Sequence, residues 1–411
     1  MEGMVFDNLS KLLEPCPPEE FFASSWGKSY RHVAGWKGKF SHLLPWDQLN
    51  TILRQHRLDF PRLRLVRDGQ SLPSSAYLKH VTGSRGRTQI PRLLTVKLTE
   101  QLRRGATLVL DAVDELYEPL EELVEALERS VHEHVQINAY AGWRTSRGFD
   151  LHWDDHDVFI LQVTGRKRWS VYGMTRPYPL ARDIEPNQKP TGDPLWDGVL
   201  EDGDLLYIPR GWWHVAFPLD EPTLHLTVGI HKRTGLDLLK WVTEGLRSSE
   251  SFRMDLPRFS DASARAAHAE RLRTELLAHW DAVDLLERYF TDQDGLAETR
   301  AHFSLPWSAT TDVLPPSHHA RVRLLAPRPV DLKSTGDEGV IELACQGKRW
   351  RFASAAMLVL APLACGRAVS IKELCDAAQE RLDEPTVRAF LSELIRHGLV
   401  TLVSEKQQTQ P

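Results

Sequence analysis

The chain has 411 residues, of which 42% are hydrophobic and 26% charged; the composition is that of a globular protein, and the length predicts two or three domains. The net charge of −5 gives no overall electrostatic reason to expect nucleic-acid binding. No apolar run approaches the roughly 18 residues needed to cross a bilayer. The four cysteines are scattered without a C-x-x-C pair and indicate neither a disulfide framework nor a zinc knuckle. We therefore expect a cytoplasmic protein with no membrane partner.

Residues 1–134 predict a mixed α/β lead-in. We expect a short helix, an extended segment over residues 30–33 and a helix that begins at Pro45. Alternating apolar residues predict strands over 63–67 and 106–110, and helical spacing predicts helices over 94–105 and 117–130. The lead-in then passes into a strand over 135–141.

Short strands separated by Gly, Pro and Asp turns dominate residues 135–231. This pattern is typical of a double-stranded β-helix, also called a jelly roll. Residues 159–163 are predicted to be one of its core strands. A polar, Pro-rich insertion at 175–198 has no clear periodicity, and it is either the rim of a pocket that contacts substrate or an inert connector.

The pattern changes to helix after residue 231. Residues 236–246 and 262–290 have long helical patterns, and residues 311–404 predict a strand, three helices and a hairpin, which is the outline of a winged helix. The last of those helices, over 384–398, would be the DNA reader in a transcription factor. Its basic residues are offset by Glu384 and Glu393, which favours a protein-contact or structural role over DNA binding.

The stretch LHWDDHDVFILQVTGRKRWSVY, residues 151–172, combines strand patterning with ligand chemistry. His152 and Asp154 are two apart, and on a β-strand such residues project from the same face, so an imidazole and a carboxylate would converge. His214 follows an apolar strand and a Pro-Arg-Gly turn in DGDLLYIPRGWWH, and it can supply a third ligand. Two histidines and one carboxylate leave coordination positions open, as in non-haem Fe(II) oxygenases.

The segments HWDDHDVFILQVTGRKRW, YIPRGWWH and LHLTVGIH resemble the JmjC branch of the cupin oxygenases. Within that branch the chain is most similar to the ribosomal oxygenases, over about residues 138–231. The resemblance implies a dioxygenase that uses Fe(II), 2-oxoglutarate and O2, with His152, Asp154 and His214 as catalytic metal ligands. It also implies a protein or peptide substrate, such as a ribosomal protein, hydroxylated on an arginine or histidine side chain.

Lys167 is the predicted co-substrate residue. Strand alternation sends it inward, beside Trp169, and an inward lysine near a metal is costly unless it meets an anion. The distal carboxylate of 2-oxoglutarate is such an anion, and the resemblance places a co-substrate-binding basic residue at this position. The resemblance adds Asn138 and Tyr140, and Thr227 as a weaker candidate. The alternative for Lys167 is a surface lysine whose stem packs on apolar neighbours.

Other histidines compete with the proposed ligands. His156 would share the face of His152 unless the chain bends between them. His225 lies on the strand after His214, and it could lie near the iron, where it would contact a metal ligand or the substrate. We favour His214 because the Pro-Arg-Gly turn sets it at the start of the strand that the family uses. His132 and His134 lie at a helix-to-strand junction without an acidic partner, and we interpret them as structural.

The sequence pattern and the resemblance together predict an α+β fold class and an order of domains along the chain. We expect a jelly-roll (cupin JmjC) oxygenase domain with its lead-in over 1–232, a helical dimerisation domain over 233–310, a winged helix over 311–404 and a disordered tail over 405–411. A seam of apolar residues predicts a homodimer, and the alternative is that it packs within one chain. The seam comprises Leu272, Leu276, Trp280, Val283 and Leu286.

Two rival functions stand beside this interpretation. The first is a hydroxylase of a modified peptide or natural product that uses the same core. The second is a non-catalytic, metal-binding cupin that regulates transcription through its winged helix. Succinate release with and without candidate substrates separates a catalyst from a regulator.

Overall fold

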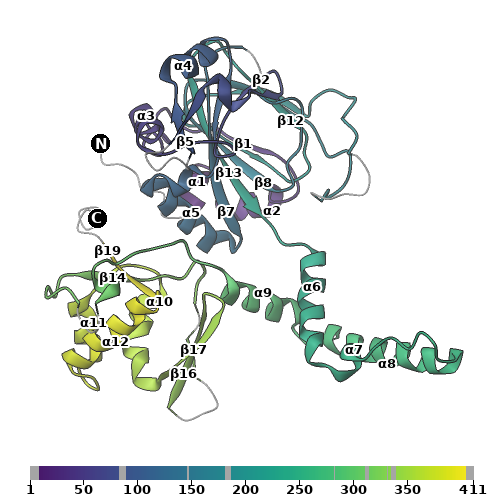
Figure 1. Ribbon diagram of the computed structural model, residues 1–411, viewed down its shortest axis with the longest axis vertical. Coiled ribbons are helices and arrows are strands. Elements are labelled where there is room, and N and C mark those ends of the chain that lie inside the picture. Colours follow the sequence, from purple (N-terminus) through teal and green to yellow (C-terminus); the bar gives the residue numbers. More distant parts are fainter. Residues whose placement is uncertain are drawn as a thin grey trace. The chain divides into compact units, whose positions relative to one another are not determined.

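The structure is a computed structural model that describes residues 9–82, 89–145, 148–180, 187–281, 283–310, 314–330, 332–334 and 339–403. The chain divides into two compact units, residues 1–232 and 233–411 (Figure 1). The tail expected at 405–411 lies outside the described residues. In the part of the chain that the structure describes, no helix is long and apolar enough to cross a membrane.

The first unit begins with the mixed lead-in that the sequence predicted. Its helices are α1 (Leu9–Leu13), α2 (Pro18–Ser24), α3 (Trp46–Gln55), α4 (Thr95–Arg103) and α5 (Glu118–Val131). Its strands are β1 (Arg31–Val33), β2 (Leu63–Arg67), β3 (Gln70–Ser71), β4 (Leu78–Thr82), β5 (Gln89–Leu93) and β6 (Thr107–Leu110). The β4–β5 hairpin was not predicted, because its residues alternate in burial only weakly.

Two antiparallel sheets form the jelly roll, which confirms the predicted core. The larger has eight strands in the order β1-β11-β8-β13-β7-β6-β2-β3, and the smaller has the order β10-β9-β12. The strands not yet given are β7 (His134–Gly142), β8 (Asp157–Thr164), β9 (Lys167–Val171), β10 (Trp196–Leu200), β11 (Leu205–Ile208), β12 (His214–Pro218) and β13 (Thr223–His231).

Alternation along β13 shows how the large sheet separates two environments. Leu224, Leu226, Val228 and Ile230 point into the main hydrophobic core, which they share with apolar residues of α1, α2, α3 and α5. The opposite face of the sheet looks toward the smaller sheet, and a second apolar cluster there draws on both sheets. The inner face is therefore where polar residues of β7, β8 and β13 can meet those of β9 and β12.

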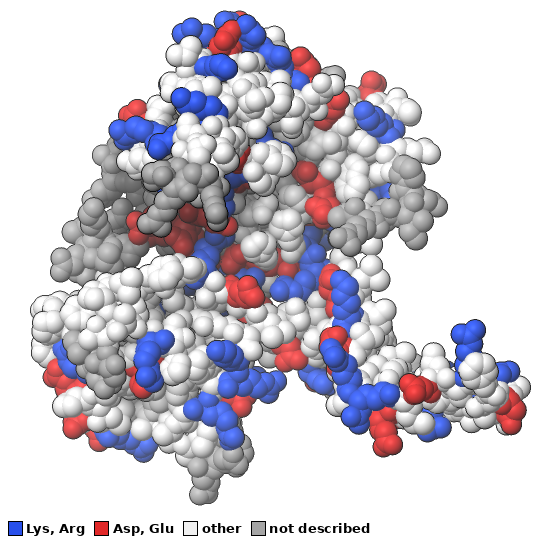
Figure 2. All heavy atoms as spheres, in the orientation of Figure 1, with Lys and Arg blue, Asp and Glu red and all other residues white. Residues whose placement is uncertain are grey.

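The second unit is helical and then mixed. It contains α6 (Gly235–Gly245), α7 (Glu250–Arg253), α8 (Ala262–Trp280) and α9 (Leu285–Leu296). The helical pattern over 262–290 is not one helix, because α8 ends at Trp280 and Asp284 adopts a left-handed φ of 62° before α9. On the face shown in Figure 2, positive and negative side chains are interspersed over both units.

The last part of the chain has its own apolar core. Its elements are β14 (Arg321–Leu324), β15 (Leu332–Ser334), β16 (Val340–Cys345), β17 (Lys348–Ala353), α10 (Met357–Ala364), β18 (Val369–Ser370), α11 (Ile371–Ala378), α12 (Glu384–Arg396) and β19 (Val400–Val403). Ser370 and Glu373 form a capping box at the start of α11. Strands pair in the order β18-β14-β19, and the separate sheet β15-β16-β17 was not predicted.

Candidate metal and co-substrate site

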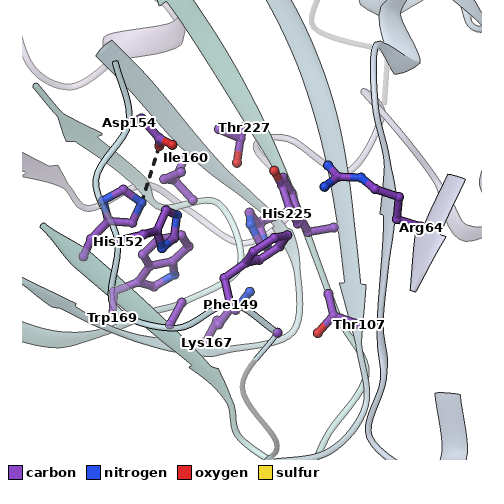
Figure 3. A pocket seen from close by; sticks show the side chains of 14 residues that line it. Arg64, Thr107, Phe149, His152, Asp154, Ile160, Lys167, Trp169, His225 and Thr227 are labelled. Atoms are coloured by element: carbon purple, nitrogen blue, oxygen red, sulfur yellow. Dashed lines mark ion pairs between the residues drawn. The ribbon is translucent and has the colours of Figure 1, made fainter. Parts of the chain in front are cut away.

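A cavity of about 230 Å³ lies in the jelly roll, on the inner face of the large sheet (Figure 3). Its lining brings together His152, Asp154 and His214 with Lys167 and other polar residues. Figure 3 shows His152 and Asp154 on one side of the cavity and Arg64 on the opposite side. The three predicted metal ligands and the predicted co-substrate lysine therefore share one space.

The backbones of His152 and His214 hold each other in place. They form an isolated antiparallel bridge, with His214 N donating to His152 O over 2.8 Å and His152 N to His214 O over 3.2 Å. Asp154 lies beyond the bridge in an irregular segment before β8, so the prediction that His152 and Asp154 share a regular strand is wrong. A bend in the chain after His152 brings the Asp154 carboxylate to the two imidazoles instead. Asp154 Oδ2 lies 3.5 Å from His214 Nε2.

The turn before His214 is tied to the loop that carries Asp154. Gly211 N donates to Asp154 O over 2.9 Å, and Arg210 N donates to Asp157 Oδ1 over 2.9 Å. Gly211 has a φ of 82°, a conformation that favours glycine. Asp157 is fully buried and also pairs with Lys232 Nζ at 2.6 Å. These contacts fix the imidazole of His214 relative to the carboxylate of Asp154.

Both histidines present the ring nitrogen that a metal needs. Nδ1 of His152 lies 2.7 Å from the carbonyl of Asp150, and Nδ1 of His214 lies 3.1 Å from that of Trp212. A carbonyl only accepts, so each Nδ1 carries a proton, and in the neutral ring this leaves the lone pair on Nε2. Burial and the neighbouring His152 lower the pKa of His214, which keeps it in the neutral form that binds metals. The donor atoms of the three residues lie within 4.8 Å of one another.

Lys167 is a buried cation in the same cavity. Its side chain is 7% exposed, and its Nζ lies 5.4 Å from the centre of the Trp169 ring. Burial lowers the pKa of this amine to about 7. Among the residues that the structure describes, no carboxylate forms an ion pair with it. The site therefore favours an anionic ligand beside Lys167, since a buried ammonium is costly until it is paired.

Tyr140 and Thr227 line the cavity, whereas Asn138 does not. Asn138 Oδ1 accepts from Ala112 N over 2.9 Å, so the amide supports neighbouring backbone and the Tyr140 hydroxyl. Burial raises the pKa of Tyr140, which leaves its hydroxyl protonated and able to donate a hydrogen bond. The structure thus brings Lys167, Tyr140 and Thr227 together and sets Asn138 behind them.

The competing histidines have other surroundings. His225 lines the cavity but stacks on Tyr140 at 4.9 Å, on the side of Lys167, and its donor atoms do not join the metal group. The bend turns His156 away toward His231. His134 does have an acidic partner, contrary to expectation, because its Nδ1 lies 3.2 Å from Glu128 Oε1.

Arg64 and Phe149 line the cavity and were missed by the sequence analysis. Arg64 comes from β2 and pairs with Asp111 at 2.8 Å. Phe149 packs edge-on against Tyr140. Alternation along β2 was the available signal, because it points Arg64 away from the core that Leu63 and Leu65 enter. None of the described residues of the insertion at 175–198 lines the cavity.

Residues 114–238 match the protein family described as the JmjC domain. The chain is 30% identical over 239 residues to the bifunctional lysine-specific demethylase and histidyl-hydroxylase NO66 of Drosophila pseudoobscura pseudoobscura, covering 55% of this chain and 23% of that protein. It is 30% identical over 318 residues to human ribosomal oxygenase 1, covering 72% of this chain and 47% of that protein. The chain thus spans less than half the length of either relative.

A solved structure resembles nearly the whole chain. It is YcfD, a ribosomal oxygenase from Escherichia coli, in complex with cobalt and 2-oxoglutarate. The TM-score is 0.55 with 19% sequence identity, and the match covers 94% of this chain and 98% of that one. At this identity the likeness is one of fold.

Proposed function

We propose that the chain, whose residues 114–238 match the JmjC domain, is an Fe(II)- and 2-oxoglutarate-dependent oxygenase that hydroxylates an amino-acid side chain of a protein or peptide. One observation supports this above the others. A group of two neutral imidazoles and a carboxylate shares a cavity with a buried lysine that lacks a carboxylate partner among the described residues. That pairing fits a metal together with an anionic co-substrate.

The residues divide into distinct roles. His152 Nε2, Asp154 and His214 Nε2 would hold Fe(II) and leave positions open for the co-substrate and O2. Lys167 would bind the far carboxylate of 2-oxoglutarate, with Tyr140 and Thr227 beside it. Bound Fe(II) and 2-oxoglutarate supply the oxidising chemistry, and the protein supplies position and exclusion of water. The walls formed by Ile160, Trp169 and Phe149 serve that second purpose.

The substrate that we propose is a ribosomal protein, encountered in the cytoplasm and hydroxylated on a histidine or arginine side chain. The names of the relatives support this, since one is a histidyl-hydroxylase and the other a ribosomal oxygenase. We expect the protein, with Fe(II) and 2-oxoglutarate, to add one oxygen atom to a ribosomal protein of its own organism. Mass spectrometry of the digested substrate locates the modified residue.

An Asp154→Ala variant is the control for that experiment, because it removes the carboxylate of the metal group. Succinate release that depends on a peptide precursor, with ribosomal proteins unmodified, would favour the biosynthetic hydroxylase instead. Absence of succinate release with every substrate would favour the non-catalytic regulator.

We further propose that residues 233–310 form a dimerisation domain. Apolar side chains on and after α8 are exposed: Trp280 is 44%, Leu286 53% and Val283 82% exposed. Leu276 behaves differently, because it packs within its own chain against the cluster that contains Leu238 of α6. The intrachain alternative therefore accounts for part of the seam and leaves its outer face for a second copy.

Charges on that outer face should give a monomer. We expect Val283→Glu combined with Leu286→Glu to halve the mass measured by light scattering, because an obligate symmetric interface would bury more than about 2,000 Å² of surface that cannot tolerate unpaired carboxylates. Val96→Glu is the matched control, since Val96 of α4 is also 82% exposed. A wild-type protein that is monomeric at tens of micromolar concentration would contradict the proposal.

Residues 311–404 are proposed to be a winged helix that contacts protein or is structural. The basic residues of α12 are neutralised along the helix: Arg388 Nε lies 2.8 Å from Glu384, and Arg396 Nε lies 3.0 Å from Glu393. Because these arginines are already paired with glutamates, the helix presents little net positive charge to the phosphates of DNA. We expect no shift of duplex DNA in a gel at physiological salt. Tight, salt-dependent binding would contradict this role.

A further inference from the structure

A second group of metal-binding side chains lies outside the cavity lining. It consists of Asp155, His156 and His231, whose donor atoms lie within 4.8 Å of one another. Asp155 and His156 come from the bend before β8, and His231 is the last residue of β13. None of the three is among the described residues that line the cavity. Asp154 and Asp155 therefore belong to two separate groups although they are neighbours in sequence.

The two imidazoles are close enough to share an ion. Their ring centres lie 4.4 Å apart, and His156 Nδ1 lies 2.9 Å from Asp155 Oδ1. The His231 side chain makes no hydrogen bond with any residue that the structure describes, although the residue is partly buried. A plain ion pair between Asp155 and His156 would leave the position of His231 unexplained. An ion held between the rings accounts for all three residues.

Gly229 provides the space that places His156 beside His231. A Cβ at residue 229 would lie 2.9 Å from both Cδ2 and Nε2 of His156, so the imidazole rests directly on the β13 backbone. The φ of Gly229 is not in the left-handed region, so the backbone conformation does not require glycine there. Glycine is required because the His156 ring approaches the backbone so closely, which is a common reason for a glycine within a strand. This position brings the ring within reach of His231, two residues along.

We propose that Asp155, His156 and His231 form a second metal site, for a borderline-soft divalent ion such as Zn²⁺. Two imidazoles and a carboxylate are the ligands that zinc takes in open sites, with a water in the fourth position. The Asp155 side chain is 41% exposed, so an ion here would exchange with solvent. An ion bound to residues 155 and 156 would also restrain the loop that carries Asp154. The proposal holds whether or not the protein is an oxygenase.

Zinc binding to the metal-free full chain tests the site, with the first site disabled by His214→Ala. That residue lies on β12, which contributes no ligand to the second group. We expect the His214→Ala protein to bind one Zn²⁺ per chain by calorimetry, and its melting temperature to rise with Zn²⁺. Adding His231→Ala should weaken this binding by more than about tenfold, because losing a ligand exceeds the typical effect of losing a residue that only orients one.

Two further variants separate ligand loss from misfolding. Gly229→Ala in the same background should also abolish the zinc-dependent rise in melting temperature, because it displaces the His156 ring. His134→Ala is the matched control, since this ring stacks on His231 at 5.8 Å but is not in the donor group, and it should keep the zinc site. A His214→Ala protein that binds no zinc overturns the proposal, and so does undiminished binding after His231→Ala.

Discussion

An Asp154→Ala variant is expected to lose both Fe(II) binding and turnover. The carboxylate is the one anionic member of the group formed with His152 and His214, so its removal leaves two neutral imidazoles to compensate a divalent charge. Residues that merely orient a ligand change metal affinity by about 10–100-fold, and loss of the charged ligand itself should exceed about 100-fold. Anaerobic Fe(II) titration measures the affinity, and succinate release measures the turnover.

Two histidine variants decide whether the ligand set is right. His214→Ala should resemble Asp154→Ala, because it removes an Nε2 donor whose orientation is fixed by the Trp212 carbonyl. His225→Ala is the control, since His225 is an equally buried imidazole that lines the same cavity but stacks on Tyr140. It should keep Fe(II) binding. Full activity in His214→Ala, with loss of activity in His225→Ala, would contradict the assignment.

Strand alternation predicted much of the site because burial on a sheet is set by local periodicity. It sends Lys167 inward, and the structure buries this side chain. The neighbouring Arg166 and Arg168 are exposed and pair with surface carboxylates. The apolar strand over 159–163 likewise appears within β8, where it joins the jelly-roll core. In these cases a residue's surroundings depend on which face of one strand it occupies.

Features that depend on distant contacts were not predictable in this way. The bend after His152 arises where the bridge to His214 ends, and His214 comes from a distant part of the chain. Asn138 was expected to contact the co-substrate, yet the backbone of Ala112 occupies its side-chain oxygen. Arg64 reaches the cavity only because β2 joins the large sheet through β6. Sequence periodicity carries no information on which segments become neighbours.

A Lys167→Ala variant is expected to raise the KM for 2-oxoglutarate by at least about 30-fold. This corresponds to about 2 kcal/mol, the lower end of the cost of truncating one partner of a buried charge pair. Fe(II) affinity should change little, because Lys167 is not in the metal group. Arg168→Ala is the matched control from the same strand, since Arg168 faces outward and pairs with Asp197. An unchanged KM in the Lys167→Ala protein would contradict the assignment.

The same lysine should make co-substrate binding depend on pH. Burial holds the pKa of Lys167 at about 7, and a bound carboxylate favours the protonated amine, so the pKa rises in the complex. Between these two pKa values binding takes up a proton, and the Kd for 2-oxoglutarate should increase by up to about tenfold per pH unit above pH 7. Below pH 7 the amine is already charged, and the Kd should level off.

Calorimetric titration of 2-oxoglutarate across pH 6 to 9, roughly one unit below and two above that pKa, measures this slope. The slope should vanish in Lys167→Ala and persist in Arg168→Ala, and a slope that survives in Lys167→Ala would assign the proton to another group.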